Sequence, residues 1–310
     1  MDFSLYNNYN LALRAEFGCR VQKISINGGF TCPNRDGSKG TGGCTYCNNQ
    51  SFHPDYCQPT LTPLQQVEKG IYFFRKYASQ KYLVYFQSYT NTYAPLEVLD
   101  ALYQDALAHP HVVGIVIGTR PDCVDDRLLD YFADLAQKYY VMIEYGVEST
   151  CDETLRFINR GHDYATAVTA ITATAERGIR TSAHLILGLP GETRAAMLHH
   201  ADCLNRLPLT ALKIHQLQLI RGTFLAQQAA QSPDIIQMPT LEAYIDLVID
   251  FLERLDRRIA IERFVSQSPK SLLIAPDWGI KNYTFTAKLE RRMRERQTFQ
   301  GAQLSERTDN

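Results

Sequence analysis

Cys32-Pro33-Asn34-Arg35-Asp36-Gly37-Ser38-Lys39-Gly40-Thr41-Gly42-Gly43-Cys44-Thr45-Tyr46-Cys47 places three cysteines in a segment rich in Gly, Asn and Pro. Such a loop can bring three thiolates to one metal centre. A structural zinc site needs a closed set of four ligands, which His53 or Cys57 would complete. A four-iron cluster held by three cysteines instead leaves one iron open to bind a reactive molecule. In that case Tyr46 would shield the cluster from water.

Length and composition limit the class of protein. The chain has 310 residues, 45% of them hydrophobic, which is enough for one large core such as an α/β barrel. Its 32 basic and 33 acidic residues give a net charge of −1, so no overall field attracts it to nucleic acid or membrane, although local patches can. No leader segment opens the sequence, and no window approaches the roughly 18 apolar residues of a membrane span.

The eight cysteines therefore indicate a reducing, cytoplasmic compartment, where clustered cysteines bind metal more often than they pair. The cysteines outside the loop region are expected to be small buried residues: Cys19, Cys123, Cys151 and Cys203.

Short β-branched or aromatic runs alternate with amphipathic stretches. They predict strands at 20–26, 82–87, 112–118, 140–147, 181–187 and 212–219, and helices near 63–79, 95–108, 125–138, 163–177, 192–206 and 240–255. Successive βα units imply a parallel sheet with helices outside it. Six units fall short of the eight of a complete barrel, so we expect a partial (β/α)6 TIM-like barrel with function at the carboxyl ends of its strands.

The domain organisation follows from this pattern. We expect a core barrel over residues 1–256 with a cluster loop at 27–57. A short C-terminal extension at 257–300 and a disordered tail at 301–310 would complete the chain.

Several segments at strand or helix ends resemble one enzyme family. They are the cysteine loop, Tyr89-Thr90-Asn91-Thr92-Tyr93, Ile143-Glu144-Tyr145-Gly146-Val147-Glu148-Ser149, Ile158-Asn159-Arg160-Gly161-His162 and His184-Leu185-Ile186-Leu187-Gly188-Leu189-Pro190-Gly191-Glu192. These resemble radical S-adenosylmethionine (SAM) enzymes, in the branch of the Elongator catalytic subunit and the oxygen-independent coproporphyrinogen oxidase. The YhcC/YtqA-type family is most similar, over about residues 5–285. The first two cysteines are eleven residues apart, where most radical SAM enzymes have three, but this branch shares the longer loop.

The resemblance implies a fold of the radical SAM type and two cofactors. Cys32, Cys44 and Cys47 would bind three irons of a [4Fe–4S] cluster, and the fourth iron would bind SAM. One electron would then cleave SAM to a 5′-deoxyadenosyl radical that abstracts hydrogen from a substrate.

The resemblance also assigns SAM contacts. Gln87 and Ser88 would lie near the SAM amino group, Glu148 at the ribose, and Arg160 at the carboxylate that its planar guanidinium suits. His184 is a further candidate contact, and Leu217 a candidate partner of the adenine. Judged by residue type alone, Gln87 and Ser88 also fit an ordinary polar loop. Arg160 also fits a surface arginine, and His184 a core histidine. Lys213, His215 and Gln216 are expected to place polar groups in the barrel mouth.

The Elongator-like branch suggests a modified tRNA uridine as substrate, with a one-electron donor such as flavodoxin or ferredoxin as partner. One alternative is a small-molecule or porphyrin-like substrate, and another is a zinc-stabilised, non-enzymatic binding module. The run Lys288-Leu289-Glu290-Arg291-Arg292-Met293-Arg294-Glu295-Arg296 has a helical pattern and a net charge of +3. It is either a solvated helix or a contact to RNA phosphates.

Overall fold

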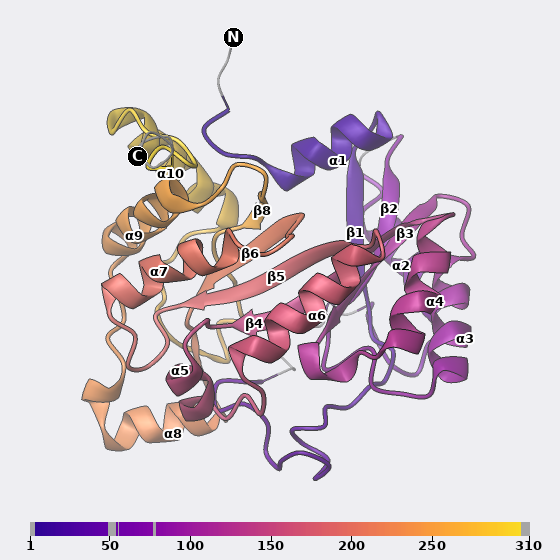
Figure 1. The fold of residues 1–310 in the computed structure, drawn as a ribbon, viewed down its shortest axis with the longest axis horizontal. Helices are drawn as coiled ribbons and strands as arrows, with labels where there is room; N and C mark the ends of the chain where they lie inside the picture. The colour runs from indigo at the N-terminus through magenta and orange to yellow at the C-terminus, as the bar shows by residue number, and fades with distance from the viewer. Residues whose placement is uncertain (1–3, 49–53, 55, 77–78, 305–310) are drawn as a thin grey trace.

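A curved sheet of seven parallel strands, in the order β1-β2-β3-β4-β5-β6-β8, organises the chain (Figure 1). The computed structural model describes residues 4–48, 54, 56–76 and 79–304. The strands are β1 (Val21–Ile26), β2 (Lys81–Phe86), β3 (Val112–Thr119), β4 (Tyr140–Glu148), β5 (Arg180–Leu187), β6 (Ala211–Gln216) and β8 (Ala260–Arg263). The sheet does not close on itself, which confirms the predicted partial barrel.

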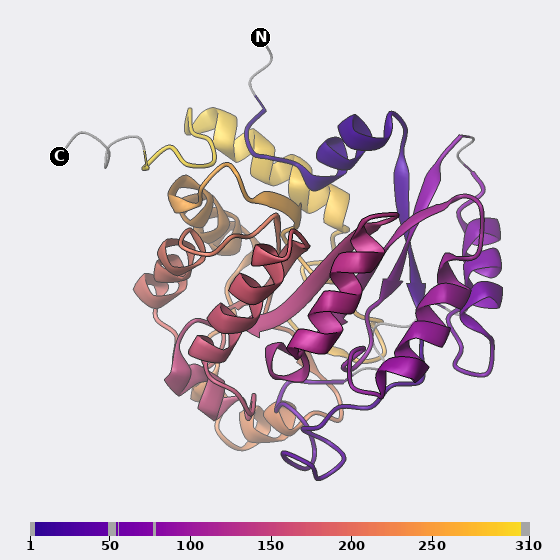
Figure 2. The same cartoon turned by 45° about the vertical axis from the view of Figure 1, so that its right-hand side comes forward.

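Helices cover the convex face of the sheet (Figure 2). They are α2 (Pro63–Phe73), α3 (Leu96–Leu107), α4 (Asp126–Ala136), α6 (Tyr164–Glu176), α7 (Arg194–Leu204) and α9 (Leu241–Arg254). Outward strand residues such as Ile24, Val84 and Ile143 are buried beneath these helices in one large apolar core. Burial of this apolar face is the main contribution to the free energy that holds helices and sheet together.

Further elements complete the described chain. They are α1 (Tyr9–Phe17), η2 (Pro121–Cys123), α5 (Asp152–Phe157), β7 (Leu219–Ile220), α8 (Phe224–Gln231), η3 (Pro233–Ile235), β9 (Leu273–Ala275) and α10 (Asn282–Glu295).

Two predicted boundaries differ from the structure. The sheet continues beyond residue 256, because β8 pairs with β6 as its seventh strand. A strand of four residues is too short to give a clear alternating pattern. The sixth predicted strand ends at Gln216, and the residues after it form β7, which pairs antiparallel with β9.

Alternation along the strands makes the concave face unusually polar. Because successive side chains point to opposite faces of a sheet, the neighbours of the buried apolar residues face the barrel interior. Five of these inward positions carry Lys23, Tyr85, Glu144, His184 and Lys213. Polar groups therefore line the interior toward the carboxyl ends of the strands.

Helix α1 closes the opposite, amino-terminal end of the barrel. Figure 1 shows it across that edge, near β1 and β8. Asn8 forms a parallel bridge with Ile261 of β8, and the Tyr9 and Tyr140 hydroxyls are 2.9 Å apart. Tyr9 and Leu13 belong to a second apolar cluster inside the barrel. Helix α1 therefore covers the end of the barrel opposite the carboxyl ends of the strands.

The basic run at 288–296 lies on α10 and is largely neutralised by α9. Arg292 contacts Glu242 at 2.6 Å and Asp246 at 2.8 Å, and Arg296 contacts Asp250 at 2.6 Å. The run carries five basic and two acidic residues (+3), and α9 presents four acidic residues to it, so the paired surface sums to −1. The four are Glu242, Asp246, Asp250 and Glu253. This favours the solvated helix over a basic contact to RNA.

Two further expectations are corrected. Disorder from residue 301 is wrong for residues 301–304, because the Gly301 and Gln303 amides donate to Leu252 and Glu253 carbonyls, each at 2.9 Å. Residues 305–310 lie outside the described part. The four scattered cysteines are half-buried rather than buried, since most lie at the ends of elements. No helix in the described ranges combines the length and the apolar character that crossing a membrane requires.

Candidate active site

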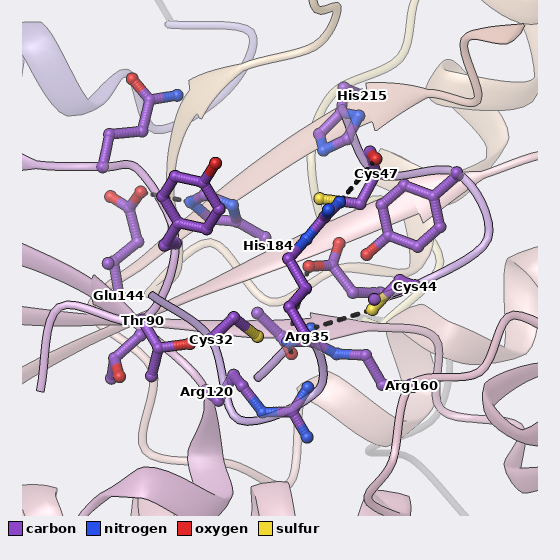
Figure 3. Close-up of a pocket in the computed structure, with 18 of the residues that line it drawn as sticks. Cys32, Arg35, Cys44, Cys47, Thr90, Arg120, Glu144, Arg160, His184 and His215 are labelled. Carbon is purple, nitrogen blue, oxygen red and sulfur yellow. Dashed lines mark hydrogen bonds and ion pairs between the residues drawn. The ribbon is translucent and has the colours of Figure 1, made fainter. Parts of the chain in front are cut away.

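The three loop cysteines meet at one cavity at the carboxyl ends of the strands (Figure 3). Cys32, Cys44 and Cys47 all line it, and its volume is about 870 Å³ with the open mouth included. Tight backbone turns hold the loop: the Arg35 amide donates to the Cys32 carbonyl at 2.8 Å, and the Gly43 amide to the Asn34 carbonyl at 2.8 Å. The long loop therefore folds back on itself around the cysteines.

The cysteine arrangement fits a polynuclear cluster. Among the described residues, no three His, Cys, Asp or Glu side chains lie close enough together to hold a single metal ion. In a four-iron cluster each cysteine binds a different iron, so three thiolates surround a body larger than one zinc ion. The Asn34 amide nitrogen lies 3.7 Å from the Cys44 sulfur, where it can donate to a thiolate ligand.

Of the two candidates for a fourth zinc ligand, only Cys57 lies in the described part of the chain. Cys57 does not line the cavity that the three loop cysteines share. His53 lies outside the described residues.

The segment after α5 is hydrogen-bonded to the cysteine loop. The Thr45 amide donates to the Ile158 carbonyl at 2.9 Å, and the Asn159 side chain donates to the Gly43 carbonyl at 2.9 Å. These bonds bring the Arg160 guanidinium to 3.6 Å from the Cys44 sulfur, as Figure 3 shows. Arg160 is 7% exposed, so its charge faces the cavity and not bulk solvent.

Glu148 reaches the cavity through an irregular strand end. The pairing of β4 with β5 shifts register between Gly146 and Glu148, and Glu148 has a φ of 67°. A bulge of this kind re-aims a side chain, and left-handed backbone at a non-glycine residue is strained. The Glu148 carboxylate then lies 3.8 Å from Arg160. A Cβ at Gly146 would lie 2.4 Å from the Arg160 Nη2, so only glycine leaves room for this pair.

Beneath the cavity lies a set of four paired charges, Lys23, Glu144, Lys213 and Glu262, which we call the charged floor. Glu144 accepts from Lys213 at 2.5 Å, and Glu262 accepts from Lys23 at 2.5 Å and from Lys213 at 3.1 Å. Tyr85 and His184 also bond to Glu144. Burial opposes ionisation of Glu144, but attraction to Lys213, Lys23 and His184 outweighs it and holds the pKa of Glu144 well below its usual value.

The structure brings together most of the residues predicted for the site. Gln87, Glu148, Arg160 and His184 line the same cavity as the cysteines. Ser88 is buried directly after β2 but does not line the cavity. Leu217 lies in an adjoining cavity, which shares Tyr46, Cys47 and His215 with the first.

The polar residues expected from β6 separate into three environments. His215 lines the cavity, whereas Lys213 is 1% exposed in the charged floor. Gln216 is turned away and donates to the Ser266 carbonyl at 3.0 Å.

Other residues of the site were not predicted. Arg120 lines the cavity and bonds to Asp122 at 2.8 Å and 2.9 Å. It directly follows a predicted strand, so its position at a carboxyl end could have indicated it. Glu144 was an acidic residue inside an otherwise apolar strand, which is also a signal. Lys23, Glu262 and Arg263 gave no comparable indication, because their strand partners are distant in sequence.

A curved parallel half-barrel with three cysteines at its carboxyl-terminal mouth defines a class of radical enzymes. The Radical SAM superfamily profile matches residues 31–204, and the Radical_SAM C-terminal domain profile matches residues 209–295. The chain belongs to the radical SAM superfamily. It is accordingly an enzyme that uses a [4Fe–4S] cluster and SAM.

Individual relatives agree with this assignment. YtqA of Bacillus subtilis (strain 168) is 34% identical over 299 residues, covering 96% of this chain and 92% of that protein. YhcC of Escherichia coli (strain K12) is 34% identical over 292 residues, covering 94% and 93%. The tRNA uridine(34) acetyltransferase of Methanocaldococcus infernus is 30% identical over only 81 residues, which are 26% of this chain and 15% of that protein.

Among solved structures, the archaeal Methanocaldococcus infernus Elp3 with an N-terminal deletion is similar in fold. Its TM-score is 0.69 at 16% identity, covering 90% of this chain and 64% of that one.

Proposed function

We propose that Cys32, Cys44 and Cys47 hold the [4Fe–4S] cluster and that the surrounding cavity binds SAM and shields a substrate from water. The observation that carries this proposal is that the three cysteines share one cavity with Gln87, Glu148 and Arg160. When bound, the cluster and SAM supply reductive cleavage to a 5′-deoxyadenosyl radical, which abstracts hydrogen.

The side chains of the chain have distinct tasks in this proposal. Arg160 offers a charge-assisted bond to the SAM carboxylate, and Glu148 accepts from the ribose hydroxyls. Gln87 lies after β2, where it can face the SAM amino group. His184 is held by Glu144, so it presents a fixed ring to the cavity. Leu217 and Tyr46 supply apolar surface between the two adjoining cavities for the adenine.

We further propose that the substrate is a modified uridine of tRNA. Support comes from the short similarity to the tRNA uridine(34) acetyltransferase and from the fold shared with Elp3. This RNA substrate is not expected to bind the surface of α10, because the basic residues of that surface are ion-paired. A one-electron donor such as flavodoxin or ferredoxin would reduce the cluster, in the reducing cytoplasm that a cysteine-bound cluster favours.

Two measurements test the proposal. After anaerobic reconstitution we expect about four irons per chain, and dithionite should then convert SAM into 5′-deoxyadenosine slowly without substrate. Stoichiometric zinc with no iron uptake would contradict the cluster assignment. For the substrate, tRNA nucleosides of a deletion strain should be compared with those of strains complemented by the wild type or by Cys44→Ala. A profile that is the same in all three strains would favour a small-molecule substrate.

A further inference from the structure

The arginines of the cavity differ in whether they have a partner. Four of them line it, and three make hydrogen bonds or ion pairs to protein groups, although the Arg160 Nε and the Arg120 Nη1 have no hydrogen-bond partner. Arg160 bonds to the Gly146 carbonyl and lies near Glu148, and Arg120 bonds to Asp122. Arg35 donates to the Cys47 carbonyl at 2.9 Å. The fourth, Arg263, has a buried Nε without a hydrogen-bond partner and makes no ion pair within the described residues.

A local irregularity directs Arg263 into the barrel. Leu212 pairs with Ile261, but the next residue of β6, Lys213, pairs with Arg263, so Glu262 is an extra residue in β8. Adjacent strand residues normally face opposite sides of a sheet. This bulge lets both turn inward: Glu262 bonds to Lys213 at 3.1 Å, and Arg263 lines the cavity. Bulges next to active sites commonly re-aim one side chain in this way.

The charges around Arg263 leave its own charge uncompensated. Lys23 and Lys213 of the charged floor are matched by Glu144 and Glu262, so these four residues sum to zero. His215, which also lines the cavity, adds no charge, since burial and then Arg263 and His184 hold its pKa well below its usual value. A cation without a counter-charge in a partly enclosed site favours an anionic ligand.

The position of Arg263 separates it from the residues assigned to SAM. Those residues lie in or after β2, β4, β5, β6 and α5, and none belongs to β8. The cysteine loop follows β1, and β8 is the strand at the other edge of the sheet. An anion held by Arg263 would therefore contact a strand that carries neither the cysteine loop nor a residue assigned to SAM.

We propose that Arg263, together with His215 of the same cavity, is a binding site for an anionic oxygen group of the substrate, a carboxylate or a phosphate. The guanidinium offers two parallel N–H donors to such a group, and the imidazole can donate a third. The assignment of this anion to the substrate rests on the proposed function. It restricts the substrate to molecules that carry a negative group within reach of the reacting centre.

Anion binding to the reconstituted, SAM-loaded protein tests this site. [13C]acetate and inorganic phosphate would be titrated separately, with saturable NMR line broadening as the readout. We expect one of them to bind, and the tighter probe distinguishes a carboxylate from a phosphate site. Arg263→Gln should weaken that binding by about tenfold or more, because it removes charge-assisted bonds. Arg263→Lys keeps the positive charge but loses the two parallel N–H donors of the guanidinium. Its affinity for the anion should therefore lie between those of the wild type and Arg263→Gln. Arg291→Gln, on the exposed face of α10, is the matched control and should bind like the wild type.

Three results would overturn the site. They are no saturable binding of either anion to the wild type, equal binding to Arg263→Gln and the wild type, and a parallel loss of SAM affinity in Arg263→Gln, which would place Arg263 in the SAM site. Iron uptake and SAM cleavage by the wild type are measured without probe anions. If those fail, the proposed function fails, and the same titrations on cluster-free protein still decide whether Arg263 binds an anion.

Discussion

The cavity has two sides that are built differently. One side, the cysteine rim, consists of Cys32, Cys44, Cys47, Glu148 and Arg160, which lie on loops or at the irregular end of β4. The other side is the charged floor, whose residues lie within strands and bond mainly to one another. Backbone bonds between the cysteine loop and the segment at 158–160 hold the rim, whereas side-chain ion pairs hold the floor.

This difference separates residues kept for ligands from residues that also carry stability. Rim groups face the cavity with incomplete protein partners, so their replacement should affect cofactors more than folding. Floor groups are buried charges that compensate one another, and removing one leaves another unpaired in a low-dielectric interior. Mutations in the cysteine rim should therefore mainly reduce cofactor binding, whereas mutations in the charged floor should mainly reduce the free energy of unfolding.

The largest expected effect is on the rim. Replacing Cys32, Cys44 or Cys47 by Ala should abolish iron uptake, because three thiolates are the minimum set for a cluster with one open iron. The measurement is iron and sulfide per chain after anaerobic reconstitution. Cys57→Ala should retain the full cluster. Substantial iron in any of the three single cysteine variants, or its loss in Cys57→Ala, would contradict this ligand set.

The next largest effect should be on the floor. Glu144→Ala leaves Lys213 and Lys23 without their shared carboxylate and should lower the free energy of unfolding by about 3–5 kcal/mol. Chemical denaturation of the cluster-free protein measures this. Glu97→Ala, which breaks a fully exposed pair with Arg127, is the control and should change stability far less. Equal effects of the two variants would mean that the floor does not stabilise the barrel.

A smaller effect, specific to the cofactor, is expected for Arg160. Arg160→Ala should weaken SAM binding by about 1.5–3 kcal/mol through loss of a charge-assisted bond. Equilibrium SAM binding would be measured on protein with verified iron content, because Arg160 also lies 3.6 Å from the Cys44 sulfur. Arg156→Ala, an exposed position on α5 that contacts the Asp152 carbonyl, should bind SAM normally. Unchanged affinity in Arg160→Ala would remove it from the SAM site.

The smallest effect is expected outside both sides of the cavity, on α10. Arg291 and Arg294 are 68% and 64% exposed and pair with Glu295 and Glu290 of the same helix. Replacing both by Gln should leave iron content, SAM binding and tRNA binding nearly unchanged, since exposed pairs contribute little. Filter binding of tRNA at several salt concentrations measures the last of these. A clear fall in tRNA affinity with a flatter salt dependence would restore the RNA-contact interpretation of this helix.

The sequence by itself determined the local features of this protein. Alternation predicted five of the strands to within about one residue, because side-chain periodicity and turn residues are local properties. The spacing of Cys32, Cys44 and Cys47 predicted a metal loop, and the segments around Glu148 and Arg160 predicted their positions at strand and helix ends. All five residues line one cavity.

Only the tertiary structure decided which charges are paired. The sequence predicts either solvent or RNA around the basic residues of α10, and it predicts Lys213 in the barrel mouth. In the structure α9 neutralises the former, and Glu144 and Glu262 compensate the latter. Arg263 could not be placed from sequence, because a bulge in a strand of four residues turns it inward. Ion pairing depends on distances of a few ångströms between residues that are up to 239 positions apart, as for Lys23 and Glu262. Such contacts exist only once the sheet has curved and brought its two edge strands around the same interior.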